Sequence, residues 1–267
     1  MRRTEGRHVT LYYPAARQDE AKRFLTNLDL CADYLRWVSR IHNRISDQKM
    51  VVLMPELALN NAFVAPRIAG YDTEAVIPTL NTLDAFALEM GLPPDPSRIG
   101  CHELTHYVHL QQVAGFAWFW NLFGAVYTPQ LGLDSWFDEG LAVYYETRLQ
   151  PGTGRLIWPM WNGAFAAGVA GHRINGGDLS AFNRDFHMGN HYLIGSQFVR
   201  FLAQRYGEQK LWKLIEVQGR SIFFPLWVNL RFWQVYDKTL STLIDEFAAE
   251  VAAEVRVRPP EQRTRRA

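Results

Sequence analysis

Residues 101–109 have the sequence CHELTHYVH, which contains the pattern H-E-x-x-H within a stretch predicted to be helical. Positions four apart lie on the same face of a helix, so His102 and His106 can present two imidazole nitrogens to one metal ion. Glu103 lies beside the first histidine and can take a proton from a water molecule at that metal. The sequence therefore predicts a zinc-binding helix with Glu103 as general base.

A catalytic zinc ion has three protein ligands, so the two histidines need a third donor. A second helix is predicted at 136–146, sequence WFDEGLAVYYE, and Glu139 lies near its start. We interpret Glu139 as the third metal ligand. An acidic residue at this position is also favoured by the helix dipole without any metal, and Glu146 is the next candidate ligand.

These two segments resemble the gluzincin metallopeptidases with an aminopeptidase N-like or thermolysin-like (peptidase MA-like) catalytic domain. That family combines H-E-x-x-H with a Trp-x-x-Glu-Gly-x-Ala helix, and HYLIGSQFV at 191–199 is similar to its Tyr-x-x-Gly helix start. The resemblance spans most of the chain, although no Gly-x-Met-Glu-Asn segment of the aminopeptidases proper is present. It implies a zincin-like α+β fold: a small N-terminal mixed sheet with helices, a mainly helical C-terminal lobe, and the metal between them.

The resemblance also implies a function, that of a zinc-dependent peptidase that cleaves peptide bonds with a metal-activated water. In that family a tyrosine stabilises the oxyanion, and Tyr192 matches its position. His187 and His191 compete for this role, and Tyr192 is otherwise a first-turn aromatic of a core helix. The alternative function is a catalytically silent binding or scaffold module with the same fold.

An extended segment at 61–66 is the candidate for the edge strand that binds substrate in this family. Substrate would pair with the backbone of Asn61, Ala62 and Phe63, a mode that needs an unpaired strand edge. An interior strand without a ligand role explains the same residues equally well, because nothing in their types distinguishes an edge from a centre.

The composition fits an ordinary globular protein, with 48% hydrophobic residues and a net charge of +1 in 267 residues. A charge near zero gives no electrostatic basis for a nucleic-acid partner, so the expected partner is a peptide or protein substrate. We expect one domain over 1–258, divided into an N-terminal α/β part (1–96) and the active-site helix with a helical lobe (97–258). Residues 259–267 are expected to be a disordered tail.

Hydrophobic periodicity predicts strands at 8–13, 50–54, 61–66 and 75–78, and helices at 18–45, 95–114, 136–146, 192–206, 209–217 and 242–255. The segment 110–133 has no charged residue, but its polar interruptions leave too few apolar positions for a membrane span, so we expect it in the core or a cleft wall. His109 shares part of the helical face of His106 and would at best line the site or support a metal ligand from outside. A packed or exposed histidine is the favoured interpretation.

Cys31 and Cys101 are interpreted as core thiols, because two cysteines do not establish a disulfide framework. The first residues include no apolar segment, so we expect no signal peptide at this start of the sequence. A complete chain would therefore be cytoplasmic, whereas an excised domain would be extracytoplasmic, periplasmic or secreted, with a further domain missing.

Overall fold

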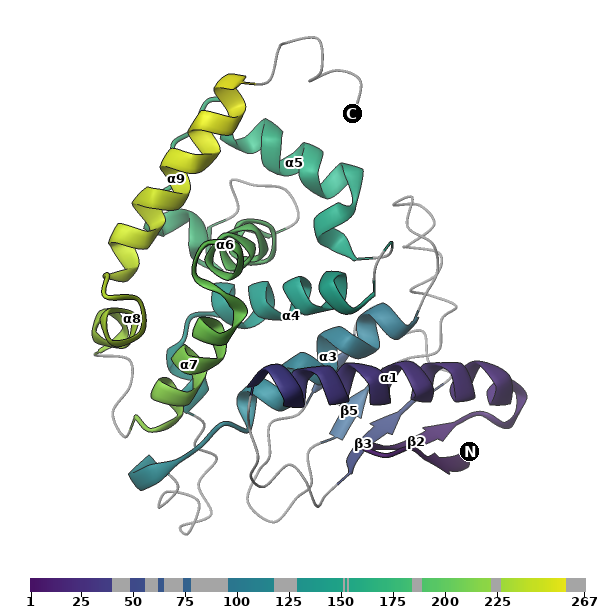
Figure 1. Cartoon of the computed structure of the whole chain (residues 1–267). Helices are drawn as coiled ribbons and strands as arrows, with labels where there is room; N and C mark the ends of the chain where they lie inside the picture. Colours follow the sequence, from purple (N-terminus) through teal and green to yellow (C-terminus); the bar gives the residue numbers. More distant parts are fainter. Residues whose placement is uncertain are drawn as a thin grey trace.

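The computed structural model describes residues 1–39, 49–55, 62–64, 74–77, 96–117, 129–150, 152, 154–183, 189–221 and 227–257. These residues form an α+β fold, in which a small mixed sheet and one long helix adjoin a larger helical part (Figure 1). This confirms the coarse part of the predicted fold class, an α+β fold with a small mixed sheet and a mainly helical remainder. The predicted tail at 259–267 lies outside the described residues.

Within the described residues, five short strands form the sheet, in the order β1-β2-β3-β5-β4. β2, β3 and β5 are parallel, and β1 and β4 pair antiparallel at the two ends. The alternating residues around 8–13 and the apolar run at 50–54 predicted the central strands, whereas β1 was not predicted. The strands are β1 (Arg2–Glu5), β2 (Val9–Tyr13), β3 (Met50–Leu53), β4 (Phe63–Val64) and β5 (Glu74–Val76).

Helix α1 (Gln18–Ser39) packs along the sheet, as its apolar periodicity predicted. Its buried face includes Phe24, Leu28 and Leu35, which recur at the spacing of one helical face. The last predicted turns of this helix, at 40–45, lie outside the described residues. Because α1 also contacts helix α3 (Pro96–Leu110), it joins the sheet to the helix that carries H-E-x-x-H.

Cys31 and Cys101 form a disulfide, with their Cα atoms 5.8 Å apart. The interpretation of these residues as separate thiols was therefore wrong. They are 70 positions apart in the sequence, and only the packing of α1 on α3 brings them together. The bond ties the two helices next to His102.

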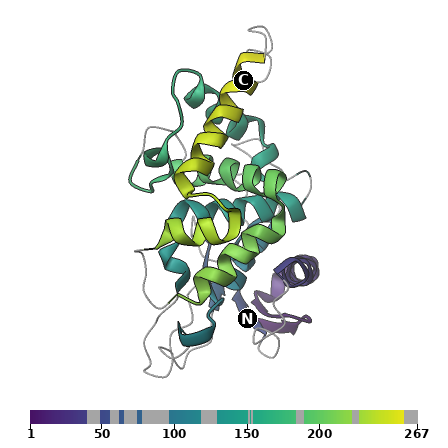
Figure 2. The same cartoon turned by 60° about the vertical axis from the view of Figure 1, so that its left-hand side comes forward.

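The remaining helices form the larger part, and the views in Figures 1 and 2 place the sheet at one end of the molecule and the end of α9 at the other. None of the described helices is long and apolar enough to cross a membrane, and residues 118–128 of the uncharged segment lie outside the described part. Two helices, α5 and α8, were not predicted. The set is α4 (Ser135–Leu149), α5 (Pro159–Val169), α6 (Asn190–Tyr206), α7 (Glu208–Gly219), α8 (Val228–Tyr236) and α9 (Leu240–Val257).

Helices α4 and α6 are in direct backbone contact through two glycines. A Cβ atom on Gly140 would stand 2.6 Å from the carbonyl oxygen of Gly195, and a Cβ on Gly195 would stand 2.5 Å from the carbonyl oxygen of Trp136. Neither position can hold a side chain without separating the helices. The contact places the start of α6, with Tyr192, close to the start of α4, with Glu139.

Replacing Gly195 with alanine should therefore lower the free energy of unfolding by about 1–3 kcal/mol, the usual cost of overpacking. Thermal unfolding followed by circular dichroism would show this as a drop of about 2–4 °C per kcal/mol. Gly163→Ala in α5 is the matched control, because a Cβ there meets no atom within 4 Å. Alanine should leave that helix as stable or slightly more stable, and equal melting temperatures for both variants would contradict the proposed contact.

Candidate metal centre

Three side-chain atoms from α3 and α4 converge on one point. The Nε2 atoms of His102 and His106 are 3.1 Å apart, and Glu139 Oε2 lies 3.3 Å from each of them. Donor atoms about 2.1 Å from a tetrahedral ion stand about 3.4 Å from one another, which is close to these spacings. The three residues predicted from the sequence are therefore arranged so that they could hold a metal ion.

The chemistry of Glu139 supports this fit. Its Oε2 atom is buried and makes no hydrogen bond among the described residues, although it lies at ion-pair distance from Nε2 of both histidines. A buried carboxylate oxygen without a hydrogen bond is costly, and metal coordination would satisfy it. The two imidazoles hold the pKa of Glu139 well below its ordinary value, although burial acts in the opposite direction. Glu139 is thus an ionised donor.

Core packing fixes the direction of the donors. On α3, Cys101, Leu104 and Val108 are buried, and on α4 Leu141 and Val143 are buried. Side chains three to four positions apart share a helical face, so packing these faces turns His102 and His106 together toward α4. The contact between α3 and α4 then brings Glu139 to them.

Asp138 orients His106. One carboxylate oxygen, Oδ1, lies 2.8 Å from His106 Nδ1, and a carboxylate can only accept, so Nδ1 carries the proton and donates it. The other nitrogen, Nε2, then has its lone pair available for a metal. Burial acts to lower the pKa of His106, but the Asp138 and Glu139 carboxylates outweigh it and hold that pKa well above its ordinary value.

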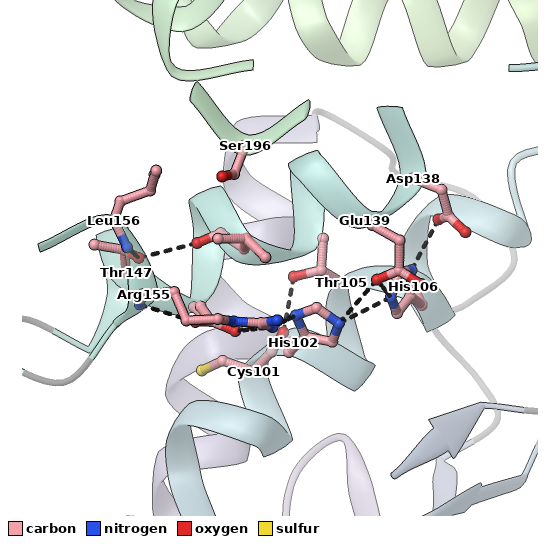
Figure 3. Close-up of polar contacts among 12 residues, drawn as sticks. Cys101, His102, Thr105, His106, Asp138, Glu139, Thr147, Arg155, Leu156 and Ser196 are labelled. Atoms are coloured by element: carbon pink, nitrogen blue, oxygen red, sulfur yellow. Dashed lines mark hydrogen bonds and ion pairs between the residues drawn. The ribbon is translucent and has the colours of Figure 1, made fainter. Parts of the chain in front are cut away.

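Arg155 contacts the other histidine, His102, on the side away from Glu139 (Figure 3), and Glu146 contacts the same ring nitrogen. Glu146 Oε2 is 3.1 Å and Arg155 Nη2 is 2.8 Å from His102 Nδ1. If Nε2 binds a metal, Nδ1 keeps its proton and donates it to Glu146, and Arg155 then pairs with Glu146 at 2.6 Å. Glu146 is fully buried and points at Nδ1, so it does not replace Glu139 as a ligand.

Glu103, the predicted general base, is also buried beside the histidines. Its charge interacts with both imidazoles and with Glu139. Burial raises the pKa of Glu103, and the Glu139 charge adds to this effect. A carboxyl group with a raised pKa accepts and returns a proton more easily near neutral pH.

Tyr192 lies at the start of α6 and faces the same group of residues. Burial and the neighbouring Glu139 carboxylate raise its pKa, and the Arg155 guanidinium carbon is 5.4 Å from the centre of its ring. The competing His191 packs against Tyr192, with ring centres 4.4 Å apart and ring planes tilted by 51°. His187 lies outside the described residues.

The candidate substrate strand is at the sheet edge. β4 ends the strand order among the described residues, pairs with β5 on one side, and contacts α3. Ala62 and Phe63 belong to this segment, whereas Asn61 lies outside the described part. The edge position favours the interpretation of these residues as a substrate-binding edge strand over that of an interior strand.

Comparison of the sequence with protein-family models and with curated proteins finds no match to either. The interpretation of the site therefore depends on its own geometry.

Sequence reasoning missed Asp138 and Arg155 as partners of the histidines, and it considered Glu146 only as an alternative ligand. Glu146 lies seven positions after Glu139, two turns along the same helical face, a spacing that could have identified it.

Metal affinity should depend on pH through His106. This residue must lose its proton before Nε2 can bind, and its raised pKa means that protons compete with the metal up to a higher pH than for an ordinary histidine. We expect zinc affinity to fall about tenfold per pH unit for one released proton as the pH is lowered. Calorimetric titrations in two buffers of different ionisation enthalpy would measure the number of released protons. A zinc affinity that does not change between about pH 8 and pH 6 would contradict the proposed competition between protons and metal at His106.

Proposed function

We propose that the protein is a zinc-dependent peptidase of the gluzincin type with a zincin-like (peptidase MA-like) fold. The observation that carries the proposal is the group His102, His106 and Glu139, whose donor atoms have the spacing of a tetrahedral site. Glu103 lies buried next to that group. The three sequence motifs of the family resemblance fall on α3, α4 and α6, the helices that carry these residues and Tyr192.

Zinc is the metal that this donor set suits best. Two imidazole nitrogens and one carboxylate oxygen are a common ligand set of catalytic zinc, and three protein ligands leave one position open for water or substrate. A bound zinc ion would supply a Lewis acid that acidifies water and polarises the scissile carbonyl.

The protein's own residues would move the proton. Glu103 would accept it from the attacking water and deliver it to the leaving amine, and its raised pKa favours the first of these transfers. Tyr192 would donate its hydroxyl hydrogen to the developing oxyanion. Because burial and Glu139 raise the pKa of Tyr192, its phenol keeps its proton at neutral pH and remains a donor.

A peptide substrate is supported by the position of β4. An extended chain could add through backbone hydrogen bonds to the outer edge of this strand, which pairs with no other described strand, and its scissile bond would then face α3. Ala62 and Phe63 would provide the backbone groups, and Asn61 is proposed to extend the same contact.

The function is tested by Glu103→Gln. The amide keeps the side-chain volume but cannot accept the proton, so zinc should stay bound while hydrolysis of casein is lost. Elemental analysis and a casein assay on the same preparation measure the two effects. Glu139→Ala is the control that should instead lose zinc, because it removes a ligand. If the wild-type protein contains zinc but does not hydrolyse casein, the silent binding module is favoured. Near-normal hydrolysis by Glu103→Gln would contradict the role of Glu103 as general base.

A second test concerns Tyr192, which should matter only in the transition state. Tyr192→Phe should lower kcat by about ten- to a thousandfold with little change in KM. The phenyl ring keeps its packing, so the melting temperature should hardly change. A variant that cleaves normally but melts early would make Tyr192 a core residue and would direct attention to His187 and His191.

A further inference from the structure

His109 is a buried histidine that the mechanism does not use. It lies one helical turn after His106 on α3, its side chain is 1% exposed, and its ring packs against Phe137 with centres 5.9 Å apart. Its Nδ1 atom is 2.9 Å from Oδ1 of Asp138. The same oxygen accepts the hydrogen bond from His106 Nδ1 at 2.8 Å, so one carboxylate oxygen receives two imidazole donors.

The second nitrogen of His109 shows that packing alone does not explain this residue. Nε2 is buried and has no hydrogen-bond partner among the described residues. A buried polar atom without a partner costs about 1–3 kcal/mol, whereas phenylalanine or leucine would fill the same space without that cost. The bond from Nδ1 to Asp138 is the interaction that a purely apolar side chain could not make.

Asp138 needs a fixed position in order to orient His106. It lies in the first turn of α4, and its side chain is 25% exposed. A partly exposed carboxylate can turn toward water unless several donors hold it. His109 comes from the buried side of α3, so its bond holds the carboxylate against that helix from within.

We propose that His109 is a positioning residue for the metal centre: its Nδ1–H fixes the Asp138 carboxylate, which in turn holds His106 with Nε2 directed at Glu139 and His102. This inference rests on the proposed metal-binding function. Residues that orient metal ligands typically change metal affinity by about 10- to 100-fold when they are replaced. His109 does not contact the metal position itself.

Two amide variants separate positioning from simple packing. Asparagine places its NH2 group near the position of Nδ1, and glutamine places it near that of Nε2. His109→Asn should bind zinc within about threefold of the wild type, while His109→Gln and His109→Phe should bind about 10- to 100-fold more weakly. Dissociation constants are measured by competition with a chelator of known affinity, and the melting temperature of each metal-free variant is recorded alongside.

His172 provides a matched control, because its Nε2 atom is 2.7 Å from Asp178 Oδ2 in a pair that involves none of the metal-site residues. His172→Phe should leave the zinc affinity unchanged. A double-mutant cycle completes the test: once Asp138→Asn has been made, adding His109→Gln should weaken zinc binding no further, because both act through the same bond.

The outcomes are distinct. If wild-type protein binds no zinc, the proposed function fails and this inference fails with it. If the wild type binds zinc and His109→Gln binds equally well, the inference alone is wrong. It is also wrong if His109→Asn and His109→Gln weaken zinc binding equally and both lower the melting temperature. The same holds if the fold-losses in zinc affinity caused by His109→Gln and Asp138→Asn multiply in the double variant.

Discussion

The burial of negative charge beside two imidazoles is the constraint on which this structure depends. Glu103, Asp138, Glu139 and Glu146 gather there, and the one permanent cation among their ion-pair partners in the described chain is Arg155. Unbalanced buried charge is costly. The neighbouring Asp138 and Glu139 carboxylates account for the raised pKa of His106. The same excess of negative charge would stabilise a divalent cation at this position.

The part of the site that depends on local geometry was predictable from the sequence. The spacing of His102 and His106 fixes their common direction as soon as the segment is helical, and the apolar positions of α1, α3 and α4 indicated those helices. The role of Glu139 could not be predicted from local geometry alone. The helix dipole also explains an acidic residue near a helix start, and the family resemblance was needed to connect Glu139 with α3. The structure brings all three together.

Contacts between distant segments could not be predicted in this way. Arg155 follows a glycine-rich loop and reaches His102 across 53 positions, and no periodicity relates the two. Cys31 and Cys101 meet only because α1 packs on α3. Helix α8 was missed because its exposed residues include Leu230 and Trp233, so the contrast between an apolar and a polar face, on which such predictions depend, is weak there.

The glycine contact between α4 and α6 has a consequence for how mutational data on this protein should be interpreted. Gly140 and Gly195 perform no chemistry, yet neither has space for any other side chain. A survey of all single substitutions would therefore mark them as intolerant alongside His102 and Glu139. Sensitivity to substitution would mark the scaffold glycines and the candidate metal ligands as one set, and only a measurement that separates folding from metal binding would distinguish the two.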